Sequence, residues 1–180
     1  MRYQERDEDK RRLFLGSLKS FPPAALVYVD ESGIDKFMHQ THSWSPRGTK
    51  VYGEVSGKRY ARESFVAAKC QSTILAPFCY TGTCNTELFN MWIEKYLVPV
   101  LKPGQVVIMD NATFHKSEKT RKLIENARCT LLFLPPYSPE LNPIEIFWAN
   151  LKKKINEIIP NVTKLSQAID KAFNVFYIQT

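Results

Sequence analysis

The sequence lacks any long apolar run. None of its 180 residues belongs to an uninterrupted apolar segment that approaches the roughly 20 residues of a membrane-spanning helix. The first 20 residues, MRYQERDEDKRRLFLGSLKS, are charged and hold no apolar core of the kind that a secretory signal peptide has. We therefore expect no membrane partner and a cytoplasmic location.

The sequence also lacks a CxxC pair. Its four cysteines, Cys70, Cys79, Cys84 and Cys129, are scattered singly, which disfavours a zinc site built on cysteine. Without an export signal we expect them to be buried free thiols. No internal repeat or low-complexity segment is present, and a hydrophobic fraction of 44% is typical of one globular domain with a proper core.

The charge balance is positive, with 25 basic against 18 acidic residues and a net charge of +7. A diffuse positive charge fits a polyanionic partner such as nucleic acid. Many ordinary globular proteins are equally basic, so the charge is only a hint.

The pattern of apolar residues predicts alternating strands and helices after a charged start. Residues 1–25 are expected to be a helical lead-in, with its helix from about Glu5 to Leu18, and residues 26–180 the main domain. Strands are expected at Leu26–Ser32, twice within Ser64–Tyr80, at Gln105–Asp110 and from Thr130. Helices are expected from about Leu88, Ser117, Asn142 and Lys164. This order predicts an α/β protein with a mixed sheet and helices on its faces.

Two aspartates follow apolar strands. Asp30 comes after Leu26–Val29, and Asp110 comes after Val106–Met109. Ligands of open α/β sheets gather outside the carboxyl ends of parallel strands. If these strands are parallel neighbours, their ends lie about 5 Å apart. Two carboxylates that close repel each other, so the arrangement favours a divalent cation.

A third acid, Glu145, follows a stiffened loop. Four prolines fall within the nine residues from Pro135 to Pro143, and each fixes φ and favours an extended residue before it. Asn142 then fits an N-cap and Pro143 the first helical residue, which would put Glu145 at the third position. Oxygen ligands from two strand ends and one helix start suit magnesium or manganese.

Each acid also has a structural interpretation. Asn142-x-x-Glu145 resembles a capping box, in which Glu145 would only satisfy backbone donors. Aspartate at the end of a strand is common turn chemistry. Glu31 and Glu140 are rival acids, although alternation allows only one of Asp30 and Glu31 to face the site. The residues by themselves leave these choices open.

Three blocks of the sequence together resemble one family. The blocks DES (Asp30–Ser32), MDNATFH (Met109–His115) and LPPYSPELNPIEIFW (Leu134–Trp148) are similar to those of the DDE transposases of the insertion sequence 630 and mariner superfamily. The spacing is also similar to that of one branch, because 34 residues lie strictly between Asp110 and Glu145. SWSPRG, residues 43–48, looks like the family's tryptophan–arginine–glycine segment.

The resemblance implies a ribonuclease-H-like fold, an α/β fold with a mixed five-stranded sheet and helices on both faces. It implies that Asp30, Asp110 and Glu145 are the catalytic triad and bind two Mg²⁺ or Mn²⁺ ions, in preference to Glu31 and Glu140. The activity implied is cleavage of DNA at the element ends, followed by strand transfer of the freed 3′ hydroxyl to target DNA, usually at a TA step.

Other residues are auxiliary candidates. Asn111 could orient a ligand or form a turn, and His115 could contact a phosphate or an attacking water, or bond to backbone. Four residues are candidates for contact with DNA: Trp44, Arg47, Lys152 and Lys153. The alternatives are a place in the core for the tryptophan and a solvated helix face for the lysines.

The start of the chain departs from the family. Full-length members carry an N-terminal helix-turn-helix region that reads the inverted repeats, and the roughly 25 residues before the first strand are too few for it. The chain resembles a catalytic half, which implies a partner: a helix-turn-helix polypeptide, or such a region fused by frameshifting. We also expect a homodimer on DNA and a nucleoid-associated, bacterial-type protein.

Two other functions remain as hypotheses. One is a ribonuclease-H-like nuclease that acts by hydrolysis only, which strand-transfer products on a TA-containing target would exclude. The other is a non-catalytic DNA-binding remnant with purely structural acids. Its DNA binding would be indifferent to magnesium and to the loss of Asp110.

Overall fold

The computed structural model of the protein describes residues 7–35 and 62–178, so Trp44 and Arg47 lie outside the described residues. The described residues contain one five-stranded sheet with the order β3-β2-β1-β4-β5. Its strands are β1 (Leu26–Asp35), β2 (Arg62–Cys70), β3 (Thr73–Thr81), β4 (Val106–Met109) and β5 (Thr130–Phe133). β1 is antiparallel to β2 and parallel to β4, which confirms the mixed sheet.

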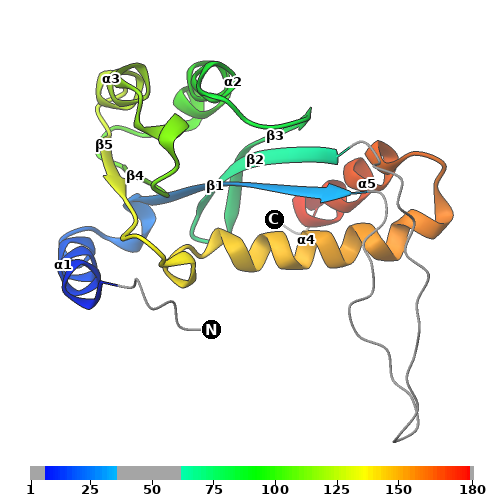
Figure 1. The fold of residues 1–180 in the computed structure, drawn as a ribbon, viewed down its shortest axis with the longest axis horizontal. Coiled ribbons are helices and arrows are strands. Elements are labelled where there is room, and N and C mark those ends of the chain that lie inside the picture. The colour runs from blue at the N-terminus through cyan, green and yellow to red at the C-terminus, as the bar shows by residue number, and fades with distance from the viewer. Residues whose placement is uncertain (1–6, 36–61, 179–180) are drawn as a thin grey trace, which may run out of the picture.

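Helices cover both faces of this sheet, as predicted. They are α1 (Glu8–Leu18), α2 (Thr86–Trp92), α3 (Glu118–Asn126), α4 (Ile144–Ile158) and α5 (Leu165–Ile178). In Figure 1, α2 and α3 lie on one side of the strands, and α4 and α5 lie on the other. Within the described ranges, no helix has both the length and the apolar character that crossing a membrane requires.

Alternation along the strands separates two apolar cores. Val29 of β1 and Val66 of β2 are fully buried in the core that includes α2. Phe65 and Ala67, which flank Val66 along β2, are fully buried in the core beneath α4 and α5. Burying one such large side chain contributes about 1.5–3 kcal/mol. The sheet is therefore anchored from both sides, which gives the strand ends a rigid base.

A third apolar cluster holds α1 against the sheet. Phe14 of α1 is buried together with Val106 and Ile108 of β4 and with Leu134. α1 is therefore packed on the strand that leads to Asp110 and on the beginning of the proline-rich loop.

The two parallel strands β4 and β5 differ in burial. β4 is fully buried from Val106 to Met109, as a central parallel strand should be. β5 lies at the edge of the sheet, so Thr130 is exposed and the next three residues are only partly buried. The prediction of buried cysteines is correct for Cys129 but wrong for Cys79, which is exposed.

β1 is longer than predicted, because it continues beyond Ser32 to Asp35. Antiparallel pairing with β2 persists to the pair Asp35–Arg62 and keeps the chain extended. Gly33 suits this stretch, since a Cβ there would lie 2.5 Å from Nε of Arg62. The parallel pairing with β4 covers only the first part of β1. Asp30 therefore lies within a strand, just beyond that pairing, and not in a turn.

Candidate active site

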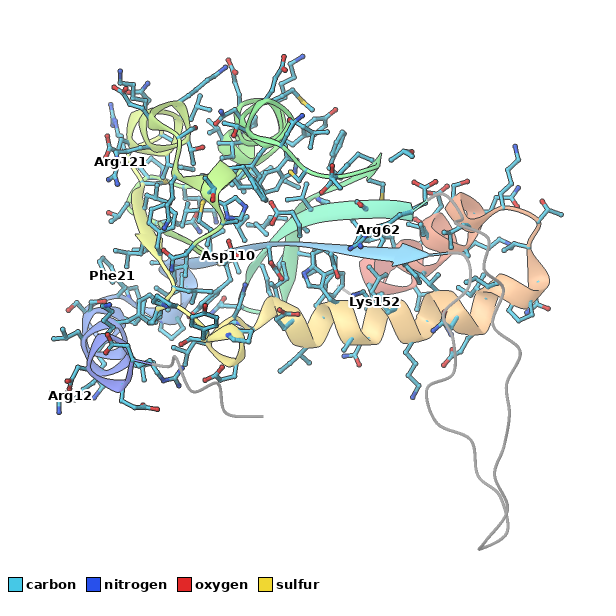
Figure 2. All side chains as sticks on the ribbon, viewed as in Figure 1. Arg12, Phe21, Arg62, Asp110, Arg121 and Lys152 are labelled. Carbon is cyan, nitrogen blue, oxygen red and sulfur yellow. The ribbon has the colours of Figure 1, made fainter. Side chains whose placement is uncertain are left out.

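Three carboxylates line one cleft: Asp30 from β1, Asp110 directly after β4 and Glu145 in the first turn of α4. The cleft has a volume of about 410 Å³, and residues 134–139 of the proline-rich loop form much of its wall. Figure 2 shows Asp110 in the middle of the molecule, beside the strands and near the beginning of α4. The parallel neighbours β1 and β4 thus bring the two aspartates together as the sequence predicts.

Asp30 is held on the face of the sheet that α4 covers. Its Oδ2 accepts a hydrogen bond of 3.1 Å from Nε1 of Trp148. Burial raises the pKa of Asp30 to about 8, together with the negative charges of Glu145, Glu31 and Asp110. A buried acid whose charged form is disfavoured by other acids is typical of functional sites.

Asp30 and Glu31 point to opposite faces of β1, as strand alternation predicts. Asp30 pairs with Ala67, which belongs to the core beneath α4. Glu31 pairs with Val66, which belongs to the core on the α2 side. Of these two acids, only Asp30 lines the cleft.

Asp110 is held from behind through one of its two oxygens. Its Oδ1 accepts the backbone N–H of Ala112 at 2.9 Å and lies 2.7 Å from Nδ1 of His115. The first bond is the turn that the sequence allows for an aspartate at the end of a strand. Burial raises the pKa of Asp110, but the bonds from His115 and Ala112 and nearby positive charge bring it below its ordinary value. Among the described residues, no donor bonds to Oδ2.

His115 lies behind Asp110 and is fully buried. Its Nε2 lies 2.8 Å from Oε1 of Glu31, so each ring nitrogen faces a carboxylate. Burial lowers the pKa of His115, but the bonds to Asp110 and Glu31 and their charges raise it to about 9. The ring is therefore an imidazolium that donates from both nitrogens. Being buried, it does not make the predicted contact with a phosphate or water in the cleft.

Glu145 is exposed at the start of α4. The helix begins at Ile144, and its N-cap position is Pro143, one residue later than predicted. Asn142 is therefore not the N-cap, although its Oδ1 accepts the N–H of Ile144 at 3.4 Å. The predicted capping box is not formed, since the N–H of Asn142 donates to the carbonyl of Pro139 at 2.9 Å. No partner of the Glu145 carboxylate is found within the described part of the chain.

The proline-rich loop is held from outside by α1. Arg11 is only 7% exposed. It donates from Nη1 to Oγ of Ser138 at 2.7 Å and lies 2.6 Å from Oε1 of Glu140. Glu140, the other rival acid, is thus part of an ion pair and does not line the cleft. Nothing in the sequence indicates this contact, because 127 residues separate Arg11 from Ser138.

Of the remaining candidate residues, Asn111 lies at the cleft, and the two lysines lie farther along α4. Asn111 lines the cleft, and its Nδ2 donates to the carbonyl of Leu134. This hydrogen bond connects the residues that follow β4 with those that follow β5. Lys152 follows Glu145 on α4 by about two helical turns, or roughly 10 Å, on nearly the same side of the helix. Lys153 is turned about 80° away from that side. Figure 2 shows Lys152 on α4, farther along the helix than the cleft.

The three acids offer only oxygen ligands. Carboxylate oxygens are the ligands that Mg²⁺ and Mn²⁺ prefer over softer donors. In the described ranges, no three acid, histidine or cysteine side chains already converge closely enough to hold a metal ion. The chemistry of the donors thus fits these ions, although the side chains do not form a closed cage as they stand.

The mixed five-stranded sheet carries one acid within β1, one directly after β4 and one at the beginning of α4, and this arrangement defines the class of fold as ribonuclease-H-like. Residues 25–166 match the family of DDE superfamily endonucleases. This match covers most of the chain, and the protein belongs to that family.

The chain is also similar to known transposases in sequence and in structure. The chain is 33% identical over 122 residues to the Transposable element Tc3 transposase of Caenorhabditis elegans, which is 66% of this chain and 34% of that protein. The Mos1 strand transfer complex matches with a TM-score of 0.64 at 16% identity, over 94% of this chain and 57% of that chain. The Mos1 transposase catalytic domain with raltegravir and Mg matches with a TM-score of 0.64 at 15% identity, over 96% of this chain and 81% of that chain. The chain thus spans about a third of the Tc3 transposase, and these structures confirm the predicted fold.

Proposed function

We propose that the protein is the catalytic domain of a DNA transposase, which cleaves the ends of an insertion sequence and transfers the freed 3′ ends to target DNA. The observation that carries this proposal is that Asp30, Asp110 and Glu145 line one cleft from three separate elements. Membership of the DDE endonuclease family and the identity with the Tc3 transposase support it. In this proposal the three acids are the catalytic triad.

The proposed cofactors are two Mg²⁺ or Mn²⁺ ions, which Asp30, Asp110 and Glu145 would hold. In support, burial raises the pKa of Asp30 to about 8 together with the charges of the other acids, and the second effect is expected of carboxylates that share a site. The Mos1 catalytic domain, a structural relative, has been solved with Mg. The chemistry that such ions supply to phosphodiester cleavage is activation of the attacking oxygen and stabilisation of the leaving oxygen.

The chain's own side chains orient the acids in this proposal. Trp148 donates to Asp30 and thereby limits rotation of that carboxylate. The amide of Asn111 joins β4 to β5 and so steadies the backbone next to Asp110. Lys152, on nearly the same side of α4 as Glu145, would pair with a DNA phosphate near the cleft.

The remaining parts of the proposal concern DNA and its recognition. Trp44, Arg47 and Lys153 are proposed as further DNA contacts, and a TA step as the target. The matched part covers only 34% of the Tc3 transposase. We therefore propose that a helix-turn-helix region, on another polypeptide or fused to this one, reads the inverted repeats. A homodimer would hold the two element ends, in the cytoplasm and at the nucleoid.

The test is a Mn²⁺ titration by calorimetry, followed by cleavage of element-end DNA. The variants are Asp110→Asn, which keeps the shape but removes one ligand charge, and Asp9→Asn, the same exchange on an exposed residue outside the cleft. We expect Asp110→Asn to lose Mn²⁺ affinity and cleavage together, while Asp9→Asn keeps both. Equal affinity and equal activity in all three proteins would refute the triad. Products of hydrolysis without strand transfer would favour a nuclease instead.

A further inference from the structure

Glu31 is an acid that the proposed triad does not use. Its side chain is only 15% exposed and lies on the side of β1 away from the cleft. Its Oε1 is 2.8 Å from Nε2 of His115. Burying an acid is costly unless its charge is paired, so this pair restricts where the acid and the ring can lie.

His115 is held by two aromatic rings as well as through its nitrogens. The ring centroid lies 4.2 Å from that of Phe89 and 4.4 Å from that of Phe114. The ring is fully buried between these partners. A rotation of the imidazolium would break its bond to Glu31 or to Asp110. The ring therefore transmits the position of one carboxylate to the other.

We propose that Glu31 is a positioning residue for Asp110 and acts through His115. The inference rests on the proposed function, in which Asp110 holds a divalent ion. Both His115 and Ala112 bond to Oδ1 of Asp110, and no described residue bonds to Oδ2. Fixing Oδ1 from behind leaves Oδ2 as the oxygen that faces the cleft. Groups that orient a metal ligand in this way change metal affinity or activity by about 10- to 100-fold when they are lost.

Two substitutions of Glu31 separate position from charge. Glu31→Ala removes the acceptor of His115, and Glu31→Gln keeps an acceptor oxygen but loses the charge. Mn²⁺ affinity by calorimetry, the kcat and KM of DNA cleavage, and thermal unfolding are measured for each. We expect Glu31→Ala to lower Mn²⁺ affinity about 10-fold, and Glu31→Gln to restore most of that loss. Glu118→Ala, which removes an exposed acid paired with Lys122, is the matched control and should match the wild type.

A double-mutant cycle tests the path through His115. In a His115→Asn background the connection is already broken, so adding Glu31→Ala should cause no further loss of Mn²⁺ affinity. A full further loss would show that Glu31 acts on the ion directly and would overturn the proposal. Equal losses in Glu31→Gln and Glu31→Ala would overturn it too, because charge and not position would then matter. That comparison stands even if His115→Asn does not fold.

The failure of this inference differs from the failure of the proposed function. If Asp110→Asn abolishes Mn²⁺ binding while Glu31→Ala changes only the unfolding temperature, the triad stands and the role of Glu31 is structural. If Asp110→Asn leaves Mn²⁺ binding unchanged, the proposed function fails, and the inference fails with it.

Discussion

Replacing Asp30 with asparagine should stabilise the metal-free protein at neutral and alkaline pH. Asparagine keeps the shape of the side chain and an oxygen that can accept the bond from Trp148. It removes a carboxyl group whose charged form burial and the charges of Glu145, Glu31 and Asp110 disfavour. Stability and the proposed activity should therefore change in opposite directions.

The sign and size of the effect follow from the pKa of Asp30, which burial and neighbouring acids raise from 3.8 to about 8. A raised pKa in the folded protein gives stability that is complete below pH 3.8 and is lost as the pH rises towards 8. Each pH unit in this window lowers the free energy of unfolding by about 1.4 kcal/mol. The wild type should therefore lose about 2–4 kcal/mol of that free energy between pH 4 and pH 7. The Asp30→Asn protein should be spared this loss.

His115 should add to the wild-type trend at higher pH. Burial lowers its pKa, but its two carboxylate partners raise it from 6.5 to about 9. Its contribution to stability is therefore complete below pH 6.5 and is lost as the pH rises through 9. Asp110 acts outside this window, because its lowered pKa gives stability that is lost only as the pH falls below its ordinary value.

The assay is urea unfolding in EDTA at several pH values between 4 and 8, with wild type, Asp30→Asn and Asp9→Asn. The free energy of unfolding of Asp30→Asn should equal that of the wild type at about pH 4 and exceed it by about 2–4 kcal/mol at pH 7. Asp9 is exposed, so its exchange should leave the wild-type profile unchanged. A profile of Asp30→Asn parallel to that of the wild type would show that Asp30 titrates normally, and the argument from burial and repulsion would be refuted.

Three further outcomes are expected. Trp148→Phe keeps an aromatic ring in the core but removes the donor to Asp30, which is mainly uncharged at pH 7, so it should lower the free energy of unfolding in urea at that pH by about 0.5–1.5 kcal/mol. Arg11→Met should lower the free energy of unfolding by about 1–3 kcal/mol, because it leaves the buried Ser138 hydroxyl with one partner fewer. DNA cleavage should slow as well. Full cleavage activity in a less stable protein would mean that the proline-rich loop does not need the contact with Arg11. Mn²⁺ at 100 times its Kd should raise the free energy of unfolding by about 2.7 kcal/mol, and Asp110→Asn should lose most of that gain.

Much of the fold could be predicted because its signals are local. Apolar runs marked the strands, and the order of strands and helices predicted the mixed sheet. Alternation correctly separated Asp30 from Glu31, since neighbouring residues of a strand face opposite sides. The length of β1 was missed, because Ser32 and Gly33 look like a strand end and only pairing with β2 keeps them extended.

The partners of the acids could not be predicted, because they come from distant parts of the chain. His115 reaches Glu31 across 84 positions, and Arg11 reaches Ser138 across 127. Neither the periodicity of apolar residues nor the spacing of motifs in the sequence predicts such a long-range contact. The sequence suggests a loop histidine and a helix arginine, whereas the structure shows that both are buried behind the cleft.

The bonds already made by the two aspartates limit what they can offer to a metal ion. One oxygen of Asp30 accepts from Trp148, and one oxygen of Asp110 accepts from His115 and Ala112. Among the described residues, one oxygen of each aspartate and both oxygens of Glu145 accept no hydrogen bond, so the proposed triad would offer about four such oxygens to its ions. Two octahedral ions would need roughly twelve ligands. Most of the coordination would therefore come from water and from the phosphate oxygens of DNA.

This shortage makes metal binding and DNA binding interdependent. Ions that draw part of their coordination from DNA should bind weakly to the protein alone and more tightly once an uncleavable DNA end is present. By reciprocity, the ions should tighten DNA binding by the same factor. Calorimetric titration of Mn²⁺ with and without such DNA would measure that factor, and equal affinities would mean that the protein completes the coordination without DNA. A triad with so few oxygens to spare would thus assemble its metal site fully only on the DNA that it is to cut.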